Sequence, residues 1–252
     1  MADSALSAIL QQVESAKPEL DGYAPAGFEW YMRSRKTVQT VVPWLIHEAA
    51  GLRMYVEEVL NSPTLLREAW SALKIQIDSP AEVARIDELL KNESVLLDFI
   101  AGDTVSTVVT GHLLARFPDS VLAGNSKSDY PDLFLKTSDY SKLPVRTRED
   151  KEIGAALRGK QRKPVRVPDG LEIKTSRDKA NIDCHYPHVG LHLMLSFINT
   201  GQKVVVDDVL AAFLQHAHYR ITEPKTKATT LKASFSRAHF VSLLPAAQGG
   251  SP

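Results

Sequence analysis

Only one cysteine, Cys184, is present among the 252 residues of the chain. A single thiol excludes an internal disulfide framework and is typical of proteins from a reducing cytosol. Long apolar runs are also missing, and none approaches the roughly 20 residues that span a bilayer. The N-terminus lacks the basic segment and the apolar core of a secretory signal. We therefore expect a cytosolic protein that makes no contact with membranes.

Net charge is also absent, because 30 Lys and Arg balance 30 Asp and Glu. The balance hides an asymmetry: residues 1–100 hold 9 basic and 15 acidic residues, and the remainder holds 21 and 15. Residues 136–163 alone hold 9 basic and 4 acidic residues. A basic region on a neutral protein is typical of a phosphate-binding surface. A solvated loop balanced by an acidic region explains the same counts.

Helical patterns dominate residues 1–100. Residues 40–61 carry apolar side chains at helical spacing, and Pro43 predicts an interruption there. Ser62 followed by Pro63 predicts the start of another helix, because serine caps helices and proline is tolerated at the first position. The same signature recurs at Ser79 and Pro80.

The hydrophobic period shortens after residue 118. Before that point, residues 102–117 predict a helix with Asp103 as a candidate cap, although their Val and Thr content leaves a strand open. Short runs rich in β-formers follow, bounded by turn residues. These runs are residues 120–124, 132–137, 170–176 and 191–199.

Residues 204–219 predict a helix that starts near Asp207. Residues 220–236 predict a hairpin whose turn contains Pro224. Strands mixed with helices predict an α/β (α+β) fold, in which a mixed central sheet is flanked by helices. The expected organisation is a helical N-terminal region, residues 1–100, followed by a core domain, residues 101–252.

The segment GLEIKTSRD, residues 170–178, combines apolar alternation with two charged side chains. In a strand, Leu171 and Ile173 would enter the core, whereas Glu172 and Lys174 would stand together on the other face. A half-exposed edge strand with a surface ion pair, worth about 0–1 kcal/mol, explains this pattern. A metal site with a charge-stabilising lysine explains it as well.

The dipeptide Pro131-Asp132 completes the pattern. Three Glu-x-Lys triplets occur in the chain, but only Glu172/Lys174 lies in an apolar alternation. Three Pro-Asp pairs also occur, and Pro131-Asp132 leads directly into a predicted strand. A Pro-Asp before one strand is thus followed, 40 residues later, by a Glu-x-Lys within another.

This arrangement resembles the PD-(D/E)xK nuclease superfamily, which includes most type II restriction endonucleases. The resemblance covers about residues 102–200 and implies a restriction-endonuclease-like fold, a mixed sheet flanked by helices. Asp132 and Glu172 match the metal-binding carboxylates of the family, and Lys174 matches its lysine. The 40-residue gap is long for the family.

The resemblance implies chemistry that depends on a divalent cation. Mg²⁺ prefers hard oxygen ligands and keeps several waters, so Asp132 and Glu172 suffice when a phosphate supplies another oxygen. Mn²⁺ is the expected substitute. The backbone carbonyl of Ile173 is expected to point near the site, and Lys174 is expected to stabilise charge in the transition state. Many family members place a glutamate in the preceding helix, where this chain offers Asp103 and His112 instead.

Basic side chains near these motifs are candidates for contacts with the phosphates or bases of DNA. Most lie in the insertion between the two motif strands, and the others follow the Glu172 strand or lie on the C-terminal hairpin. The candidates are Arg146, Arg148, Arg158, Arg162, Lys163, Arg177, Lys179, Lys232 and Arg237.

A competing metal site is suggested by Cys184, His185, His188 and His192, which have spacings found in zinc clusters. Pro187 and Gly190 interrupt any single helix, so these ligands would need a tight loop. Loop and strand residues without a metal explain the same spacing.

The resemblance favours a Mg²⁺-dependent, sequence-specific endonuclease that acts on double-stranded DNA in the prokaryotic cytosol. Cutting both strands of a palindrome favours a homodimer, since symmetric sites match symmetric proteins. A repair or mobile-element nuclease would use the same residues. A DNA-binding regulator with an inert nuclease-like domain is the alternative outside enzymes.

Overall fold

The computed structural model describes residues 2–22, 29–74, 80, 84, 87–88, 102–117, 122–124, 131–135, 170–177, 181–184, 187–222 and 232–245. The helices are α1 (Ala2–Asp21), α2 (Trp30–Asn61), α3 (Pro63–Lys74) and α6 (Gly102–Arg116). The strands are β1 (Leu122–Gly124), β2 (Leu133–Leu135), β3 (Gly170–Arg177), β4 (Asn181–Cys184), β5 (Gly190–Asn199), β6 (Val204–Leu214), β7 (Tyr219–Thr222), β8 (Lys232–Ser236) and β9 (Val241–Ser242). Two 3-10 turns, η2 (His216–His218) and η3 (Arg237–His239), follow β6 and β8. No helix in these ranges is long and apolar enough to cross a membrane.

The described strands form two sheets. The large sheet has the order β1-β2-β3-β5-β6-β9, and the small sheet has the order β4-β8-β7. Within the large sheet β3 and β5 run parallel and the other neighbours run antiparallel, so the sheet is mixed. A mixed α+β architecture was predicted, and it is confirmed at that level.

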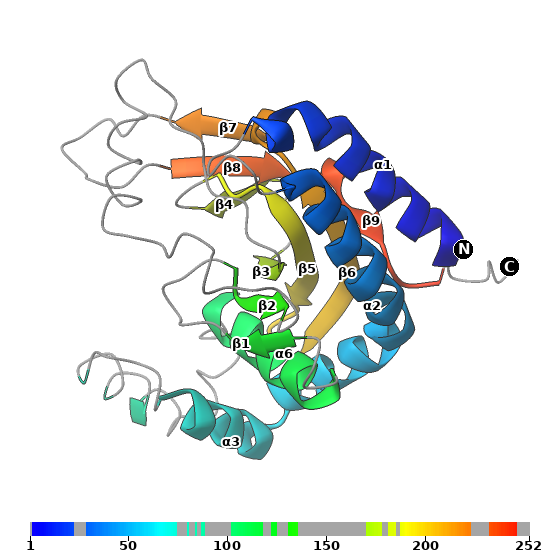
Figure 1. Cartoon of the computed structure of the whole chain (residues 1–252). Helices are drawn as coiled ribbons and strands as arrows, with labels where there is room; N and C mark the ends of the chain where they lie inside the picture. The colour runs from blue at the N-terminus through cyan, green and yellow to red at the C-terminus, as the bar shows by residue number, and fades with distance from the viewer. Residues whose placement is uncertain are drawn as a thin grey trace, which may run out of the picture.

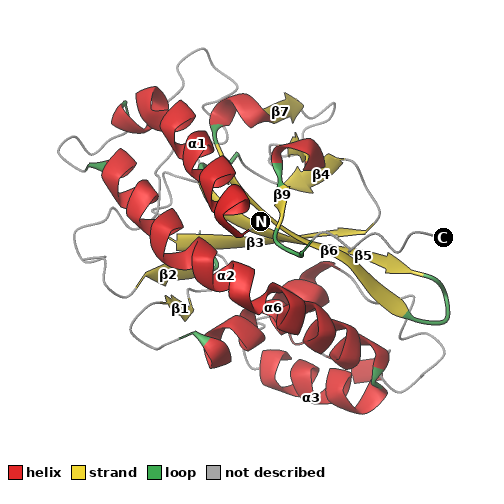
Figure 2. Cartoon of the chain, turned by 90° about the vertical axis from the view of Figure 1, so that its right-hand side faces the viewer, coloured by secondary structure: helices red, strands yellow, loops and turns green. Residues whose placement is uncertain are grey.

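The large sheet lies between a helical layer and the small sheet. Side chains of α1, α2 and α6 share one hydrophobic core with Leu171 and Ile173 of β3 and with the β5 residues on the same face. On the opposite face, Met194 and Leu210 pack against Ile182 of β4 and Phe235 of β8. Figure 1 shows the small sheet beside the long strands, and Figure 2 shows α1 and α2 in front of them.

The helices form where apolar side chains recur every three or four residues. In α1 these side chains are Ala5, Ile9, Val13, Ala16 and Leu20, all buried. Such a stripe must be covered by other elements, and here α2 and the large sheet cover it. Helix α3 begins after Ser62, whose Oγ accepts a hydrogen bond from the Leu65 N–H at 3.3 Å, so the predicted cap is confirmed.

The predicted interruption of the second helix at Pro43 is wrong. Helix α2 continues through Pro43, whose side chain is exposed. Val41 and Val42 before the proline and Leu45 after it are buried in one core. This burial offsets the one intrahelical hydrogen bond that proline cannot donate.

The helix predicted from near Asp207 is also wrong, because residues 204–214 form strand β6. β6 pairs antiparallel with β5 through a turn in which Gly201 adopts a φ of +79°, a conformation that favours glycine. The predicted strands at residues 170–176 and 191–199 are confirmed as β3 and β5, and those at 120–124 and 132–137 are confirmed over β1 and β2. Residues 120–121 and 136–137 lie outside the described residues. The helix over residues 102–117 is confirmed as α6.

The C-terminal hairpin is confirmed as β7 and β8, which pair antiparallel. Its predicted turn at Pro224 lies outside the described residues, as does Ser79. The proposed boundary at residue 100 stays a prediction. Within the described ranges, α1 and α2 contribute to the same core as the sheet.

Candidate active site

Strand β3 places Glu172 and Lys174 on the face of the sheet that is turned away from the helices. Leu171 and Ile173 alternate with them and enter the helix-covered core, as the alternation predicted. β3 lies between β2 and β5, and the Glu172 side chain is only 7% exposed. A surface ion pair on an exposed edge strand, the simpler interpretation of the sequence, is therefore excluded.

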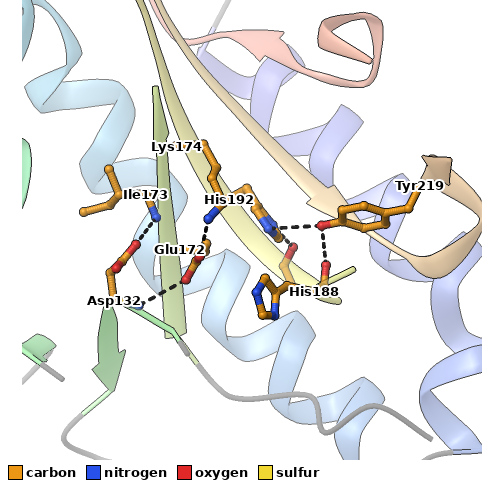
Figure 3. Close-up of polar contacts among 8 residues, drawn as sticks. Asp132, Glu172, Ile173, Lys174, His188, His192 and Tyr219 are labelled. Carbon is orange, nitrogen blue, oxygen red and sulfur yellow. Dashed lines mark hydrogen bonds and ion pairs between the residues drawn. The ribbon is translucent and has the colours of Figure 1, made fainter. Parts of the chain in front are cut away.

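The pairing of β2 with β3 brings Asp132 to this pair. Leu133 and Phe134 pair with Leu171 and Gly170, so Asp132 comes to lie beside Glu172 and Ile173. The Ile173 N–H donates to Asp132 Oδ2 at 2.7 Å, and the Asp132 N–H donates to Glu172 Oε2 at 3.3 Å (Figure 3). Two carboxylates 40 residues apart in the sequence thus meet at one point of the sheet.

Lys174 completes the group. Its Nζ donates to Glu172 Oε1 at 2.5 Å, from two residues along the same strand face. Two carboxylates beside one ammonium carry a net charge of −1 when all three are ionised. Such a group is suited to a divalent cation, which would more than compensate that charge.

Burial perturbs all three groups. Burial raises the pKa of Glu172 to about 7, and Asp132 adds to this rise while Lys174 opposes it. Burial also raises the pKa of Asp132, against the lowering effect of the Ile173 N–H. Burial disfavours the Lys174 ammonium, but the charge and hydrogen bond of Glu172, together with the charge of Asp132, raise the pKa of Lys174. Clustered perturbation of this kind is typical of functional sites.

The backbone of Ile173 offers a further oxygen. Its N–H points to the Asp132 side of β3. In a strand, the N–H and C=O of one residue point to the same side, so the Ile173 carbonyl also points to the side of β3 on which Asp132 lies. Two carboxylates and one carbonyl match the oxygen ligands of Mg²⁺, which keeps several waters. Over the described ranges, no three His, Cys, Asp or Glu side chains are grouped so that they could hold a metal ion.

The residues of the alternative zinc cluster have other partners. His192 is buried on β5, where its Nδ1 lies 2.8 Å from the Gly190 carbonyl and its Nε2 lies 3.3 Å from the Tyr219 hydroxyl. Both ring nitrogens of His192 are thus engaged within the protein. Cys184 is half-buried on β4, and His185 lies outside the described residues.

Tyr219 and its link to His192 were missed in the sequence. The Tyr219 hydroxyl donates to the His188 carbonyl at 2.6 Å and joins β7 to the chain leading into β5 (Figure 3). The one available signal was the alternation in β5, which places His192 on the same face as Met194. Nothing in the sequence indicated that Tyr219 would reach it.

The predicted DNA-binding residues are mostly outside the described part of the chain. Arg177 is exposed at the end of β3. Arg237 donates to Ser196 Oγ at 2.8 Å and to Asp207 Oδ2 at 3.0 Å, so its guanidinium contacts β5 and β6. Only the backbone of Lys232, in β8, is described. The candidates outside the described residues are Arg146, Arg148, Arg158, Arg162, Lys163 and Lys179.

The two candidates for a third acidic position lie on α6. Asp103 belongs to the first turn of that helix, and its side chain is outside the described set. His112 is half-buried and packs against the Tyr55 ring of α2, with ring centroids 4.5 Å apart. Because α6 packs on the helical side of the sheet, His112 lies across the sheet from Glu172.

No protein-family model matches the sequence, and no match was found among curated proteins or solved structures.

Proposed function

We propose that the protein is a Mg²⁺-dependent endonuclease for double-stranded DNA, with a restriction-endonuclease-like site of the PD-(D/E)xK type. The observation that carries this proposal is the meeting of Asp132 and Glu172, from separate strands, with Lys174 bonded to Glu172. The sequence resemblance named these three residues, and their proximity supports it.

The residues of the candidate site would have two roles, metal binding and charge stabilisation. Asp132, Glu172 and the Ile173 carbonyl would hold Mg²⁺, or Mn²⁺ in its place. Once bound, the cation would polarise the phosphodiester and acidify water. Lys174, freed from part of its contact with Glu172, would donate to the anionic oxygens of the phosphate as charge develops there.

Burial favours this proposal over an inert domain. Keeping two carboxylates and an ammonium out of water costs free energy, and a buried ion pair is often no better than apolar residues of similar volume. In an inert domain, no activity would offset this loss of stability. A repair or mobile-element nuclease remains the second candidate, since the same three residues would serve it.

The proposal includes a homodimer in the prokaryotic cytosol. Two copies related by a two-fold axis would present one site to each strand of a palindrome. Sequence-specific reading is assigned to the basic side chains of residues 136–163 and of the C-terminal hairpin.

Plasmid cleavage tests the activity. We expect supercoiled DNA to be cut in Mg²⁺ or Mn²⁺ and to stay intact in chelator. Glu172→Gln should lower the cleavage rate about a hundredfold or more, because it removes a charged oxygen ligand. Glu48→Gln is the matched control: Glu48 is also buried and paired with a basic side chain, Arg116, but it lies on α2.

Two results would refute the nuclease. One is a wild-type protein that leaves varied DNA intact in both metals. The other is a Glu172→Gln variant that cuts as fast as Glu48→Gln.

A further inference from the structure

His192 stands directly beside Glu172. In the parallel pairing of β3 with β5, Glu172 is in register with His192, and Lys174 is in register with Met194. Side chains of paired residues share one face of a sheet. The His192 side chain therefore lies next to the candidate catalytic carboxylate, at 0% exposure.

The orientation of the His192 ring is fixed by its two hydrogen-bond partners. The Gly190 carbonyl can only accept, so Nδ1, 2.8 Å away, carries the proton. Nε2 is then an acceptor, and it faces the Tyr219 hydroxyl at 3.3 Å. The same hydroxyl lies closer to the His188 carbonyl, at 2.6 Å, so one O–H group serves two acceptors.

This contact connects the two sheets. Tyr219 begins β7 of the small sheet, whereas His192 belongs to β5 of the large sheet. Phe235 of β8 encloses the contact, with ring centroids 5.5 Å from Tyr219 and 6.1 Å from His192. A buried polar contact inside an apolar cluster defines one relative position, because sliding the sheets would leave its polar groups unpaired.

We propose that Tyr219 and His192 are positioning residues for the candidate active site: they fix the small sheet and residues 187–189 against the strand face that carries Glu172 and Lys174. The inference rests on the proposed nuclease function. In this role, the small sheet forms a rigid wall of the candidate site, next to the carboxylates proposed to bind the metal. Neither side chain needs to touch DNA for this role.

Tyr219→Phe is the test, because it removes one oxygen and keeps the ring. Tyr31→Phe is the control: the Tyr31 hydroxyl also bonds a side chain of another element, Glu14, but it does so in the helical layer. A small misplacement of a catalytic group can cost about a hundredfold in rate. We therefore expect Tyr219→Phe to lower kcat about tenfold or more in saturating Mg²⁺.

DNA affinity, measured in Ca²⁺, should change less than about twofold, since Tyr219 and His192 do not contact DNA in the proposed role. His192→Gln should show the same loss of kcat. Tyr31→Phe should keep kcat even if its thermal midpoint falls as far as that of Tyr219→Phe.

The outcomes separate the two proposals. If the wild type cuts DNA and Tyr219→Phe keeps its kcat, the positioning role is refuted and the nuclease stands. Equal loss of kcat in Tyr31→Phe also refutes it, because the effect is then general destabilisation. If the wild type does not cut, the nuclease falls, and Mn²⁺ binding measured by electron paramagnetic resonance decides: weaker binding in Tyr219→Phe supports positioning, and unchanged binding refutes it.

Discussion

At the scale of single residues, His192 is a neutral imidazole held where protonation is costly. Burial, with a smaller contribution from the charge of Lys174, lowers its pKa to about 3. The other groups that face it include His218 of η2, which also lowers its pKa, and Tyr219 of β7. This side chain therefore makes the stability of the fold depend on pH, which an exposed histidine would not do.

We predict that His192 weakens the fold as the pH falls. Below its ordinary pKa of 6.5 the unfolded chain binds a proton at this position, whereas the folded chain does not until about pH 3. The free energy of unfolding should thus fall by up to about 1.4 kcal/mol per pH unit across that window. Between pH 7 and 5 the wild type should lose about 2 kcal/mol more than His192→Gln.

Urea unfolding at pH 7, 6 and 5 measures this difference. Other titrating groups, Glu172 among them, are common to both proteins and cancel in the comparison. Equal pH slopes for the two proteins would contradict the neutral, buried histidine.

At the scale of elements, the end of α2 takes the place of a missing neighbour strand. The edge strand β9 pairs with β6 only at Leu210 and Ala211. Further along β6, Asn61 bonds both the N–H and the C=O of Val204 at 2.7 Å, and Glu57 accepts from the Val206 N–H at 2.7 Å. Pairing of this kind covers backbone groups that would otherwise form an exposed sheet edge.

Removing the Asn61 side chain should therefore destabilise the junction. Each net hydrogen bond contributes about 0.5–1.5 kcal/mol, so Asn61→Ala should cost about 1–3 kcal/mol in unfolding free energy. Asn61→Asp, which keeps the acceptor for the Val204 N–H and loses the donor, should give an intermediate loss. Chemical denaturation followed by tryptophan fluorescence measures both, and an Asn61→Ala protein as stable as the wild type would count against the junction.

The elements also show what a sequence reveals and what it conceals. The alternation of Leu171 and Ile173 with Glu172 and Lys174 was enough to predict both faces of β3, because one face is charged. Strand β6 was mistaken for a helix because residues 209–214 are buried on both faces, which removes the alternation. Its Ala and Leu content then favoured a helix.

The site itself was partly predictable for the same reason. Asp132, Glu172 and Lys174 could be named from short motifs that report local geometry. The contact between Tyr219 and His192 depends on how the two sheets are stacked, and it joins residues 27 apart in the sequence. No short motif reports such a contact. The parallel pairing of β3 with β5, which puts His192 beside Glu172, is equally non-local.

At the scale of the whole molecule, the helical layer and the sheet depend on each other. Ile9 and Val13 of α1 are fully buried in the core that also contains Leu191 and Leu193 of β5. Without residues 1–100, the part of this sheet face that α1 and α2 cover would expose its apolar side chains to water, and only α6 of the described helices would stay on it.

We therefore predict that a fragment of residues 101–252 does not fold alone. Circular dichroism and thermal unfolding of the fragment should show no cooperative transition, whereas the full chain should unfold in one. In the full chain, Ile9→Ala should cost about 2–5 kcal/mol, as expected for a large-to-small change in a packed core. A fragment that unfolds cooperatively would instead establish two independent domains.

The contacts of α1 also set an order of events during synthesis. Gln12 accepts from the Phe213 N–H and donates to the His239 carbonyl, partners 201 and 227 residues later in the chain. At about 5–20 residues per second, the ribosome needs about 10–45 s to supply them. Until then α1 can pack against α2 but not against β6, so the part of its apolar stripe that faces the sheet stays uncovered and is available to a chaperone that binds apolar helices. A segment translated early is thus among the last to reach its final environment.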